Sequence, residues 1–320
     1  MARQVIHAND DTCDMDRRQL LGWAGVVATA SLAEPASQAA SSESLKGTSM
    51  PRRSITVDAR PAPHPLDTDQ TALLVVDMQN DFGATGGMFD RAGIDISGIK
   101  KVVAPCARVI AATRKAGMPV VYLKMAFHAD LSDLGAVDGV TRVRHLQIMH
   151  VGTEVSAPNG RPSRILIRDT WNSDILPELS PLAGDVVVYK TRFNGFYRTD
   201  LDERLRGMGV KHLIVIGCTT SVCVESTVRD AMFRDYQCVL LGDCMAEPIG
   251  NTFARSNHEA SLLTIQTLFG WVSDSASFLK AIAKTISSPS RRWQSGTRHN
   301  FSLHPAANGR HSEIPHMAIL

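Results

Sequence analysis

The chain has 320 residues, with 34 lysines and arginines against 32 aspartates and glutamates, so its net charge is +2. Hydrophobic residues make up 44% and charged residues 21%, which is typical of a globular protein and excludes a collagen-like or wholly disordered chain. The balanced charge, without a basic stripe, predicts no nucleic-acid partner.

The first 54 residues differ from the rest of the chain and are set apart from the fold. Arg17-Arg18 precedes an apolar run from Leu20 to Leu32, and Ser37-Gln38-Ala39 would suit signal-peptidase cleavage. The run is too short to span a bilayer, and the pattern resembles a twin-arginine export signal. A disordered extension and a translation start at Met50 are the alternatives. We expect a periplasmic protein if the signal is used and a cytoplasmic one otherwise, with no membrane partner in either case.

Short runs rich in β-branched residues then alternate with segments of helical periodicity. The predicted strands cover residues 71–77, 119–123, 185–189, 212–216 and 238–241. The predicted helices cover residues 99–117, 199–207, 223–235, 251–269 and 275–286. This alternation predicts an α/β fold with a mostly parallel sheet, in one domain from 55 to 286.

Two further segments have a different composition. Residues 127–170 form a long polar stretch that contains glycines, and we expect a loop there. Residues 287–320 are rich in serine, proline, arginine and histidine, which predicts a disordered basic tail. The four histidines of the tail match no metal-site spacing.

Three reactive side chains stand at the ends of predicted strands. Asp77 and Lys190 directly follow two of them, and Cys223 lies in the turn after a third and opens the next helix. Sites in open α/β sheets form at the carboxyl ends of strands, so these residues would converge if the strands are neighbours. A helix N-terminus and an ammonium group lower the pKa of a thiol, which predicts a reactive Cys223 thiolate. A carboxylate can exchange a proton with the thiol and a leaving amine.

Each of the three also has a purely structural interpretation. An aspartate after a strand is usually a turn residue, a lysine there a solvated charge, and a cysteine in an apolar chain a small core residue. The six cysteines form no Cys-x-x-Cys pair, so we expect mostly free thiols. Position alone therefore leaves the function open.

The motifs around these residues are more specific. The segment Leu74-Val-Val-Asp77-Met-Gln-Asn80-Asp-Phe82, the lysine after a strand, and Gly217-x-x-Thr220-x-x-Cys223-Val224 together resemble the isochorismatase-like cysteine hydrolases. The resemblance covers residues 66–285. Residues 222–227, 229–230 and 269–274 are most similar to ureidoacrylate amidohydrolases, whereas 217–223 and 128–133 are closer to biuret hydrolases. Both groups cleave a urea-type or acylurea C–N bond.

The resemblance implies a Rossmann-like fold, with a six-stranded parallel sheet and helices on both faces. It implies a catalytic triad of Asp77, Lys190 and Cys223, and a non-proline cis peptide just before Thr219. The amides of Thr219 and Cys223 would form the oxyanion hole, and Phe82 would line the substrate pocket. Relatives are dimers or tetramers, so we expect a homo-oligomer.

Other candidate residues have two open interpretations each. Gln79 and Asn80 could bind the substrate amide or cap the next segment. Phe196 and Tyr197, with the neighbouring Phe193, could form a wall of the pocket or pack in the core. Cys218 could form a regulatory disulfide with Cys223, although a buried apolar role is favoured.

The resemblance also bears on cofactors. Nicotinamidases of this superfamily carry an Asp-x-His-x-x-His metal site, and the second histidine is missing from the corresponding Phe127–Asp133, so we expect neither a metal nor another cofactor. Members that hydrolyse the vinyl ether of isochorismate lack the cysteine, so Cys223 argues against that reaction.

The expected function is that of a cofactor-free amidohydrolase. Its substrate would be a small urea-like, ureido or carbamoyl amide. The alternatives are a maleamate- or nicotinamide-type amide hydrolase, and a non-catalytic thiol-redox or binding protein on the same fold.

Overall fold

The computed structural model describes residues 53–250 and 254–286. The twin-arginine pattern and the histidine-containing tail lie outside the described residues, so the expectations about export and location stay predictions. The described chain begins with an antiparallel hairpin, β1 (Ser54–Val57) and β2 (His64–Asp67). Ser54, which was expected in the N-terminal extension, pairs with Asp67 and so is part of the fold.

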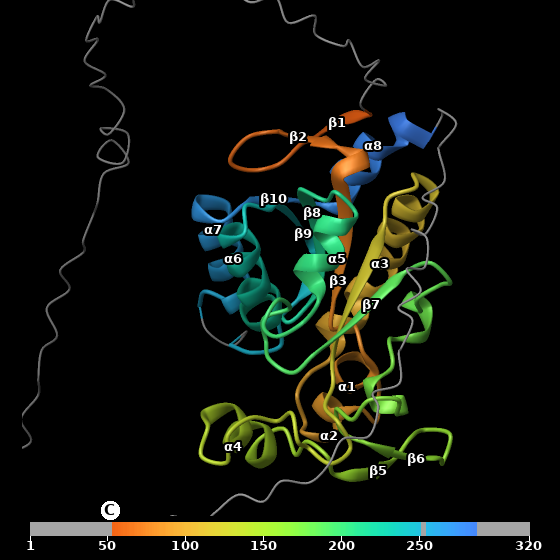
Figure 1. The fold of residues 1–320 in the computed structure, drawn as a ribbon, viewed down its shortest axis with the longest axis vertical. Helices are drawn as coiled ribbons and strands as arrows, with labels where there is room; N and C mark the ends of the chain where they lie inside the picture. Colours follow the sequence, from red (N-terminus) through yellow and green to blue (C-terminus); the bar gives the residue numbers. More distant parts are fainter. Residues whose placement is uncertain (1–52, 251–253, 287–320) are drawn as a thin grey trace, which may run out of the picture. The chain divides into compact units, whose positions relative to one another are not determined.

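Six strands form one sheet in the order β10-β9-β8-β3-β4-β7 (Figure 1). The strands are β3 (Thr71–Val76), β4 (Val120–Met125), β7 (Val186–Lys190), β8 (His212–Cys218), β9 (Gln237–Ala246) and β10 (Trp271–Ser273). Every pairing between neighbours is parallel. The α/β fold and the six-stranded parallel sheet are thereby confirmed.

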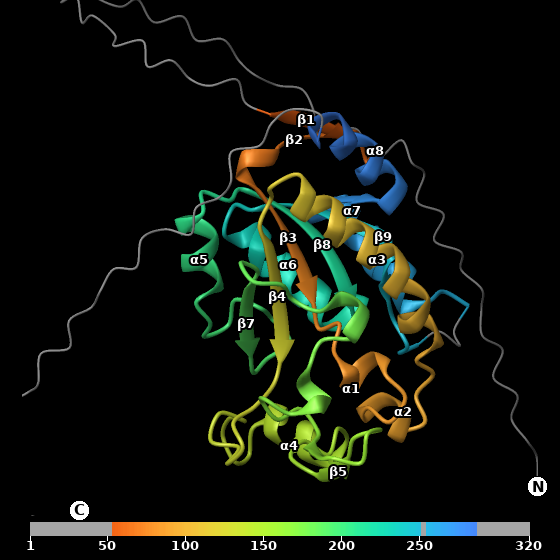
Figure 2. The same cartoon turned by 90° about the vertical axis from the view of Figure 1, so that its right-hand side faces the viewer.

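Helices cover both faces of this sheet, also as predicted. They are α3 (Ser97–Lys115), α5 (Leu201–Gly207), α6 (Glu225–Phe233), α7 (Asn257–Leu268) and α8 (Ser275–Ile286). Figures 1 and 2 show α3 and α8 on one face and α5, α6 and α7 on the other. The chain builds outward from β3 to β4 and β7, then returns to β8 and builds outward the other way. The strand order therefore reverses between β3 and β8, where α/β proteins bind ligands.

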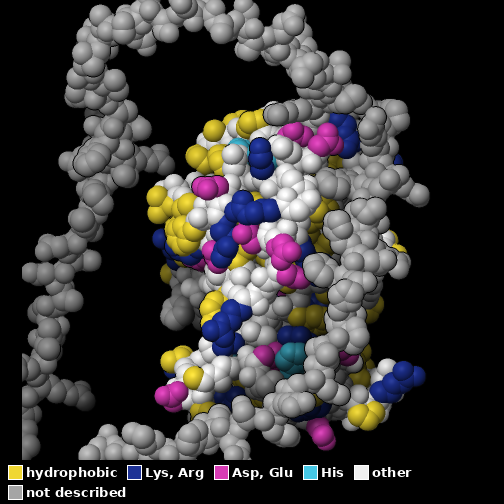
Figure 3. All heavy atoms as spheres, viewed as in Figure 1, with side chains coloured by type: hydrophobic (Ala, Val, Ile, Leu, Met, Phe, Trp, Pro, Cys, Tyr) yellow, Lys and Arg dark blue, Asp and Glu magenta, His cyan; other side chains and the backbone are white. Residues whose placement is uncertain are grey.

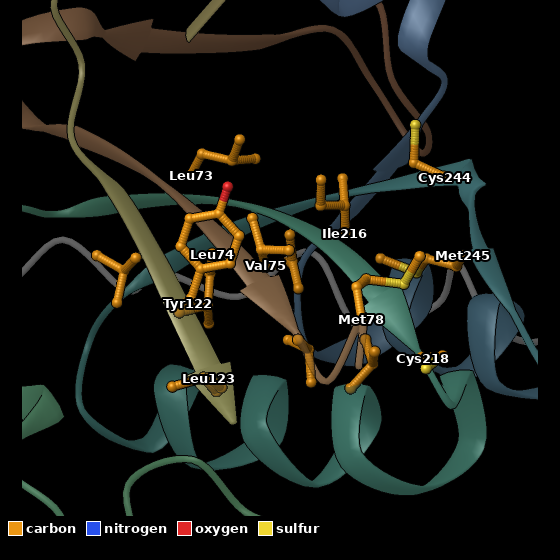
Figure 4. Close-up of a cluster of buried hydrophobic side chains, with 14 of the residues drawn as sticks. Leu73, Leu74, Val75, Met78, Tyr122, Leu123, Ile216, Cys218, Cys244 and Met245 are labelled. Carbon is orange, nitrogen blue, oxygen red and sulfur yellow. The ribbon is translucent and has the colours of Figure 1, made fainter. Parts of the chain in front are cut away.

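The central strands are buried along their whole length. All residues of β3 and β4 are buried, and Leu73 lies between Val120 of β4 and Ile214 of β8. Figure 4 shows this core, with Leu73, Leu74 and Tyr122 among the side chains drawn. Strands of a parallel sheet that is covered on both faces consist of continuous apolar residues, and for this reason these strands could be predicted from the sequence.

The segment from 127 to 170 is more structured than expected. It contains helix α4 (Val140–Gln147) and an antiparallel hairpin of β5 (Glu154–Ser156) and β6 (Pro162–Arg164). Two short helices after β3, α1 (Asn80–Gly83) and α2 (Met88–Arg91), lie with it at the carboxyl ends of the strands, at the bottom of Figure 1. We therefore expect the functional site at this end of the molecule.

Three other boundaries differ from the prediction. Strand β10 lies between the predicted helices 251–269 and 275–286, and it is too short for a pattern to reveal. Helix α7 was expected from 251, but it begins at Asn257, where Ser256 and Glu259 form a capping box. The helix expected at 223–235 begins as a π-helical turn, η5 (Thr220–Val224), and continues as α6.

The surface in Figure 3 carries mixed charges and several separate hydrophobic areas. Basic and acidic side chains lie next to one another, and pairs such as Arg204–Asp200 and Arg206–Asp202 join them on α5. Hydrophobic side chains gather over α6 and α7, where Phe233 and Leu268 are exposed. No helix within 53–250 and 254–286 is both long enough and apolar enough to cross a membrane. The oligomeric state stays a prediction.

Candidate active site

The fold brings Asp77, Lys190 and Cys223 together at the carboxyl end of the sheet. The Nζ atom of Lys190 lies 2.7 Å from Oδ2 of Asp77, and both side chains are fully buried. The Cys223 side chain lies next to both of them, and each of the three groups affects the pKa of the other two. Because β4 separates β3 from β7, only a long side chain at the end of β7 can reach Asp77. This explains why a lysine stands at that strand end.

The backbone of Asp77 is fixed by its neighbours on three elements. Its amide donates to Leu123 O of β4 at 3.0 Å, and its carbonyl accepts from Gln79 N and from Cys218 Sγ, at 2.8 and 3.1 Å. Its φ of 50° lies in the left-handed region, which aspartate tolerates better than most residues. Figure 4 shows Cys218 at the end of β8. It is a free and fully buried thiol, which agrees with the apolar role favoured from the sequence. Its hydrogen bond to Asp77, which helps to position that residue, was not predicted.

The turn that carries Cys223 has the backbone that the resemblance implies. The peptide bond between Cys218 and Thr219 is cis. The Thr219 carbonyl accepts hydrogen bonds from the amides of Val222 and Val224, at 3.1 and 3.2 Å, which ties the turn to the helix start. Thr219 and Cys223 both line the cavity described below.

Two polar side chains behind this turn were not expected to take part. Glu247 is buried just after β9, and its Oε2 accepts from both the amide and the hydroxyl of Ser221, at 2.7 and 2.6 Å. His258 Nδ1 lies 2.9 Å from Thr220 Oγ1. A signal for Glu247 existed, because a carboxylate directly after an apolar strand at this edge resembles the placement of Asp77. His258 had no such signal, since α7 is distant in sequence.

Burial controls the protonation of the triad. It raises the pKa of the Cys223 thiol, and the Asp77 carboxylate raises it further, against the opposing effect of Lys190. Burial also raises the pKa of Asp77 despite Lys190. Burial alone would lower the pKa of Lys190, but Asp77 and Cys223 raise it overall. The raised pKa of Cys223 is opposite to the lowered thiol pKa that the helix start and the ammonium group predict.

A cavity of about 290 Å³ opens onto this group. Its wall comes from α1, α2, the ends of β4 and β8, the segments after β7 and β9, and the end of α4. Apart from the groups at Cys223 the lining is apolar, and Phe82 and Phe89 meet there edge to face with ring centroids 5.1 Å apart. Phe82 thus lines the cavity, as the resemblance implies.

The other predicted substrate-binding residues do not line the cavity. Gln79 is buried, and its side-chain amide bonds to Met125 and to Ser173 O, so it holds the strand ends together. Asn80 Nδ2 donates to Trp171 O. Phe196 stacks on Tyr236, and Tyr197 is 42% exposed beside two arginines. Their side chains are already used in packing. Of the neighbouring aromatics, only Phe193 lines the cavity.

Asp81 is another buried carboxylate, and the sequence predicts no role for it. Its Oδ1 accepts from Met88 N and Asn172 Nδ2, at 3.0 and 2.5 Å, and its Oδ2 accepts from Leu166 N at 2.7 Å. Burial raises its pKa to about 6, against these hydrogen bonds and the charge of Arg91. Asp81 joins α2, which lines the cavity, to the segment before β7.

The segment Phe127–Asp133, for which no metal site was expected, contains one contact between a histidine and an aspartate. His128 and Asp133 contact each other, with Nε2 and Oδ2 3.7 Å apart. Within the part of the chain that the structure describes, no three His, Cys, Asp or Glu side chains are grouped to hold a metal ion. The expectation of a metal-free enzyme stays a prediction.

Comparison with known proteins agrees with this geometry. A ureidoacrylate amidohydrolase of Variovorax paradoxus (strain S110) is 38% identical over 228 residues, which are 70% of this chain and 86% of the relative. A second, from Serratia proteamaculans (strain 568), is 37% identical over 73% of this chain and 91% of its own. The relatives are thus named as amidohydrolases, enzymes that act on C–N bonds.

Solved structures agree in fold. The crystal structure of a cysteine hydrolase from Pseudomonas syringae pv. phaseolicola is 30% identical, with a TM-score of 0.57, and covers 69% of this chain and 96% of that one. An isochorismatase family protein from Desulfovibrio vulgaris, 24% identical with a TM-score of 0.52 over 67% of this chain and 98% of its own, shares the fold. The family model described as the isochorismatase domain matches residues 71–277. The resemblance of the motifs is confirmed, and the chain belongs to the isochorismatase family.

Proposed function

We propose that the protein is a cofactor-free cysteine amidohydrolase that cleaves a C–N bond of a small ureido, carbamoyl or other amide. The observation that carries this proposal is the buried contact of Asp77, Lys190 and Cys223 at the floor of a cavity. A thiol, a carboxylate and an ammonium group in mutual contact are a nucleophile, a proton carrier and a charge stabiliser. The names of the relatives support the same reaction class.

The first half-reaction forms a covalent intermediate and releases ammonia or an amine. Asp77 takes the proton of the Cys223 thiol as the sulfur attacks the carbonyl carbon, and the C=O electron pair moves onto oxygen. The amides of Thr219 and Cys223 donate to this oxyanion. The intermediate collapses as Asp77 returns the proton to the leaving nitrogen. A C–S bond has formed, and the C–N bond has broken.

The second half-reaction uses water in the same way. Asp77 removes a proton from water, whose oxygen attacks the thioester or thiocarbamate carbon. The C–S bond then breaks, and the sulfur recovers the proton from Asp77. Lys190 keeps its charge throughout, which stabilises the carboxylate at rest and the developing thiolate in both steps.

The test is ammonia release by the full-length protein and its Cys223→Ala variant. The panel contains ureidoacrylate, biuret, triuret, nicotinamide, maleamate, N-carbamoyl amino acids and benzamide. We expect turnover on at least one compound and a loss of about 1,000-fold or more in the variant, because the nucleophile is gone. Cys238→Ala is the matched control, since Cys238 is a fully buried thiol of β9 that does not line the cavity.

Full activity in Cys223→Ala would contradict the proposal. Reversible oxidation of Cys218 and Cys223 without any hydrolysis would instead favour the thiol-redox alternative.

A further inference from the structure

The cavity over Cys223 is apolar except at its catalytic end. Eleven of its fifteen lining residues are Phe, Met, Ile, Val or Ala, and the other four are Asp77, Cys218, Thr219 and Cys223. We infer that the substrate is neutral, with one amide or ureido group at Cys223 and a hydrocarbon or aromatic remainder, and that carboxylate-bearing amides are poor substrates. This inference rests on the proposed function and goes beyond it, because it names the substrate class.

The charges around the cavity support a neutral ligand. Asp77 is the only charged residue of the lining, and the ammonium group that neutralises it belongs to Lys190, which is fully buried against Asp77 and Cys223. No arginine or other lysine of the described chain lines the cavity, and the undescribed residues 251–253 are Asn, Thr and Phe. A substrate carboxylate would lose its hydration here without gaining a partner.

Two arginines stand next to lining residues in the sequence, and neither provides that partner. Arg91 lines another groove and donates to the carbonyls of Gly86 and Ser156, at 2.7 and 2.8 Å. Arg192 lines a separate groove, and its Nη1 donates to the carbonyls of Thr191 and Asp133, at 2.6 and 3.4 Å. Its guanidinium also lies over the Tyr197 ring, 5.6 Å from the centroid. The adjacent Phe193 lines both spaces. An anion held by Arg192 would therefore lie in the groove and not in the cavity over Cys223.

The polar groups also limit the substrate to one polar end. Of the four non-apolar lining residues, Asp77 and Cys223 belong to the triad, and Cys218 and Thr219 form the cis peptide. A second amide or carboxyl group further from Cys223 would face only apolar side chains such as Phe89 and Met149. Burying such a group without a hydrogen bond is unfavourable, whereas a methylene or an aromatic ring gains from the same burial.

The volume and the entrance of the cavity agree with a substrate that carries an aromatic ring or a short alkyl chain. The 290 Å³ of this cavity is about twice the 150 Å³ that holds a benzene molecule in an apolar protein cavity, which leaves room for an attached amide group. Ile148 and Ile249 line it while 56% and 47% exposed, so the entrance is apolar as well. A benzamide, a hexanamide or an alkyl urea fits this description.

The experiment compares neutral and anionic amides of the same shape. One pair is 4-methylbenzamide and 4-carbamoylbenzoate, and the other is hexanamide and 5-carbamoylpentanoate. We expect kcat/KM for ammonia release to be about 100-fold or more higher for the neutral member of at least one pair. Equal or better turnover of the anionic member in both pairs, or turnover of ureidoacrylate above all neutral amides, would overturn the inference.

A charge placed in the wall should change this preference. Ile148→Arg puts a guanidinium at the exposed edge of the cavity, so we expect the neutral-to-anionic ratio to fall about tenfold or more. Val140→Arg is the matched control, because Val140 begins the helix α4 that Ile148 follows, is 75% exposed and does not line the cavity. An unchanged ratio in Ile148→Arg, with the protein folded, would count against the inference.

Alkylation of Cys223 gives a readout that needs no turnover. The rates of modification by iodoacetamide and iodoacetate are measured by mass spectrometry and divided by the rates with glutathione. We expect a corrected preference of about tenfold or more for the neutral reagent. If no amide is hydrolysed but this preference holds, the cavity is as inferred and the proposed function has failed. If the anionic reagent reacts as fast, the inference has failed whatever the activity.

Discussion

Asp77 and Asp81 are both buried and are only four residues apart, yet their surroundings differ completely. Asp77 contacts an ammonium group and a thiol at the floor of a cavity. Asp81 accepts three hydrogen bonds from Met88, Leu166 and Asn172, and it does not line that cavity.

This difference distinguishes the carboxylate that can take part in the proposed reaction from one that cannot. Burial raises the pKa of both groups. The partners of Asp77 can gain or lose a proton, and a substrate can reach it. Every donor to Asp81 is an amide that keeps its proton, so Asp81 can only hold elements in place. We therefore expect Asp77 to control the rate and Asp81 to control stability.

The largest expected effect comes from exchanging the two carboxylates for amides. Asp77→Asn cannot take the thiol proton, so we expect kcat to fall by about 1,000-fold or more, with little change in the circular dichroism spectrum. Asp81→Asn places an NH₂ group against an amide donor, so we expect a loss of about 1–3 kcal/mol in the free energy of unfolding. Its kcat should change far less than that of Asp77→Asn. Similar losses of kcat in both variants would remove the distinction.

The positions of Asp77, Lys190 and Cys223 could be predicted from the sequence because the first two stand at the ends of apolar strands and Cys223 lies in the turn after a third. Apolar runs such as Leu73–Val76 are local patterns, and they place the next residue at the carboxyl edge of the sheet. The strand β10 was missed because three residues show no period. The pKa of the Cys223 thiol was predicted in the wrong direction because the prediction used only the helix start and the ammonium group, which both lower a thiol pKa. Burial and the Asp77 charge, which prevail, arise only from the folded chain.

The lining of the cavity was largely unpredictable for a related reason. Phe193 lines it and Phe196 does not, although both follow β7 within a few residues. The direction of each ring depends on the turn between them and on Tyr236, which is distant in sequence. The contact between Asp81 and Asn172 joins residues 91 positions apart. No periodic pattern encodes a contact of that kind.

The pairing of Asp77 can be tested separately from its chemistry. Lys190→Met leaves a buried carboxylate without its counter-charge, so we expect a loss of about 3–5 kcal/mol in the free energy of unfolding, measured in urea. Adding Asp77→Asn removes that charge, and the double variant should regain much of the loss. A double variant less stable than Lys190→Met would contradict the assignment of the cost to an unpaired charge.

Lys124→Met is the control for this experiment. Lys124 is buried on the adjacent strand β4, but its partner Asp174 is 59% exposed and 3.4 Å away. Water can replace the lost ammonium group there, so we expect a change of about 1 kcal/mol or less.

The smallest expected effect is a pH dependence that belongs to Asp81 alone. Burial raises its pKa from 3.8 to about 6 in the folded protein, so the folded state binds a proton more tightly than the unfolded chain does. The resulting stability is fully present below pH 3.8 and is lost as the pH rises through about 6. At 1.36 kcal/mol per pKa unit, the loss is roughly 3 kcal/mol at most.

Asp81→Asn has no proton to release at this position, and both chains keep Asp77, so the difference between their urea unfolding free energies isolates Asp81. We expect the advantage of the unchanged protein over Asp81→Asn to shrink from pH 4 to pH 6.5 and then to stay constant. An advantage that grows over the same interval would mean that the three hydrogen bonds to the carboxylate outweigh its burial.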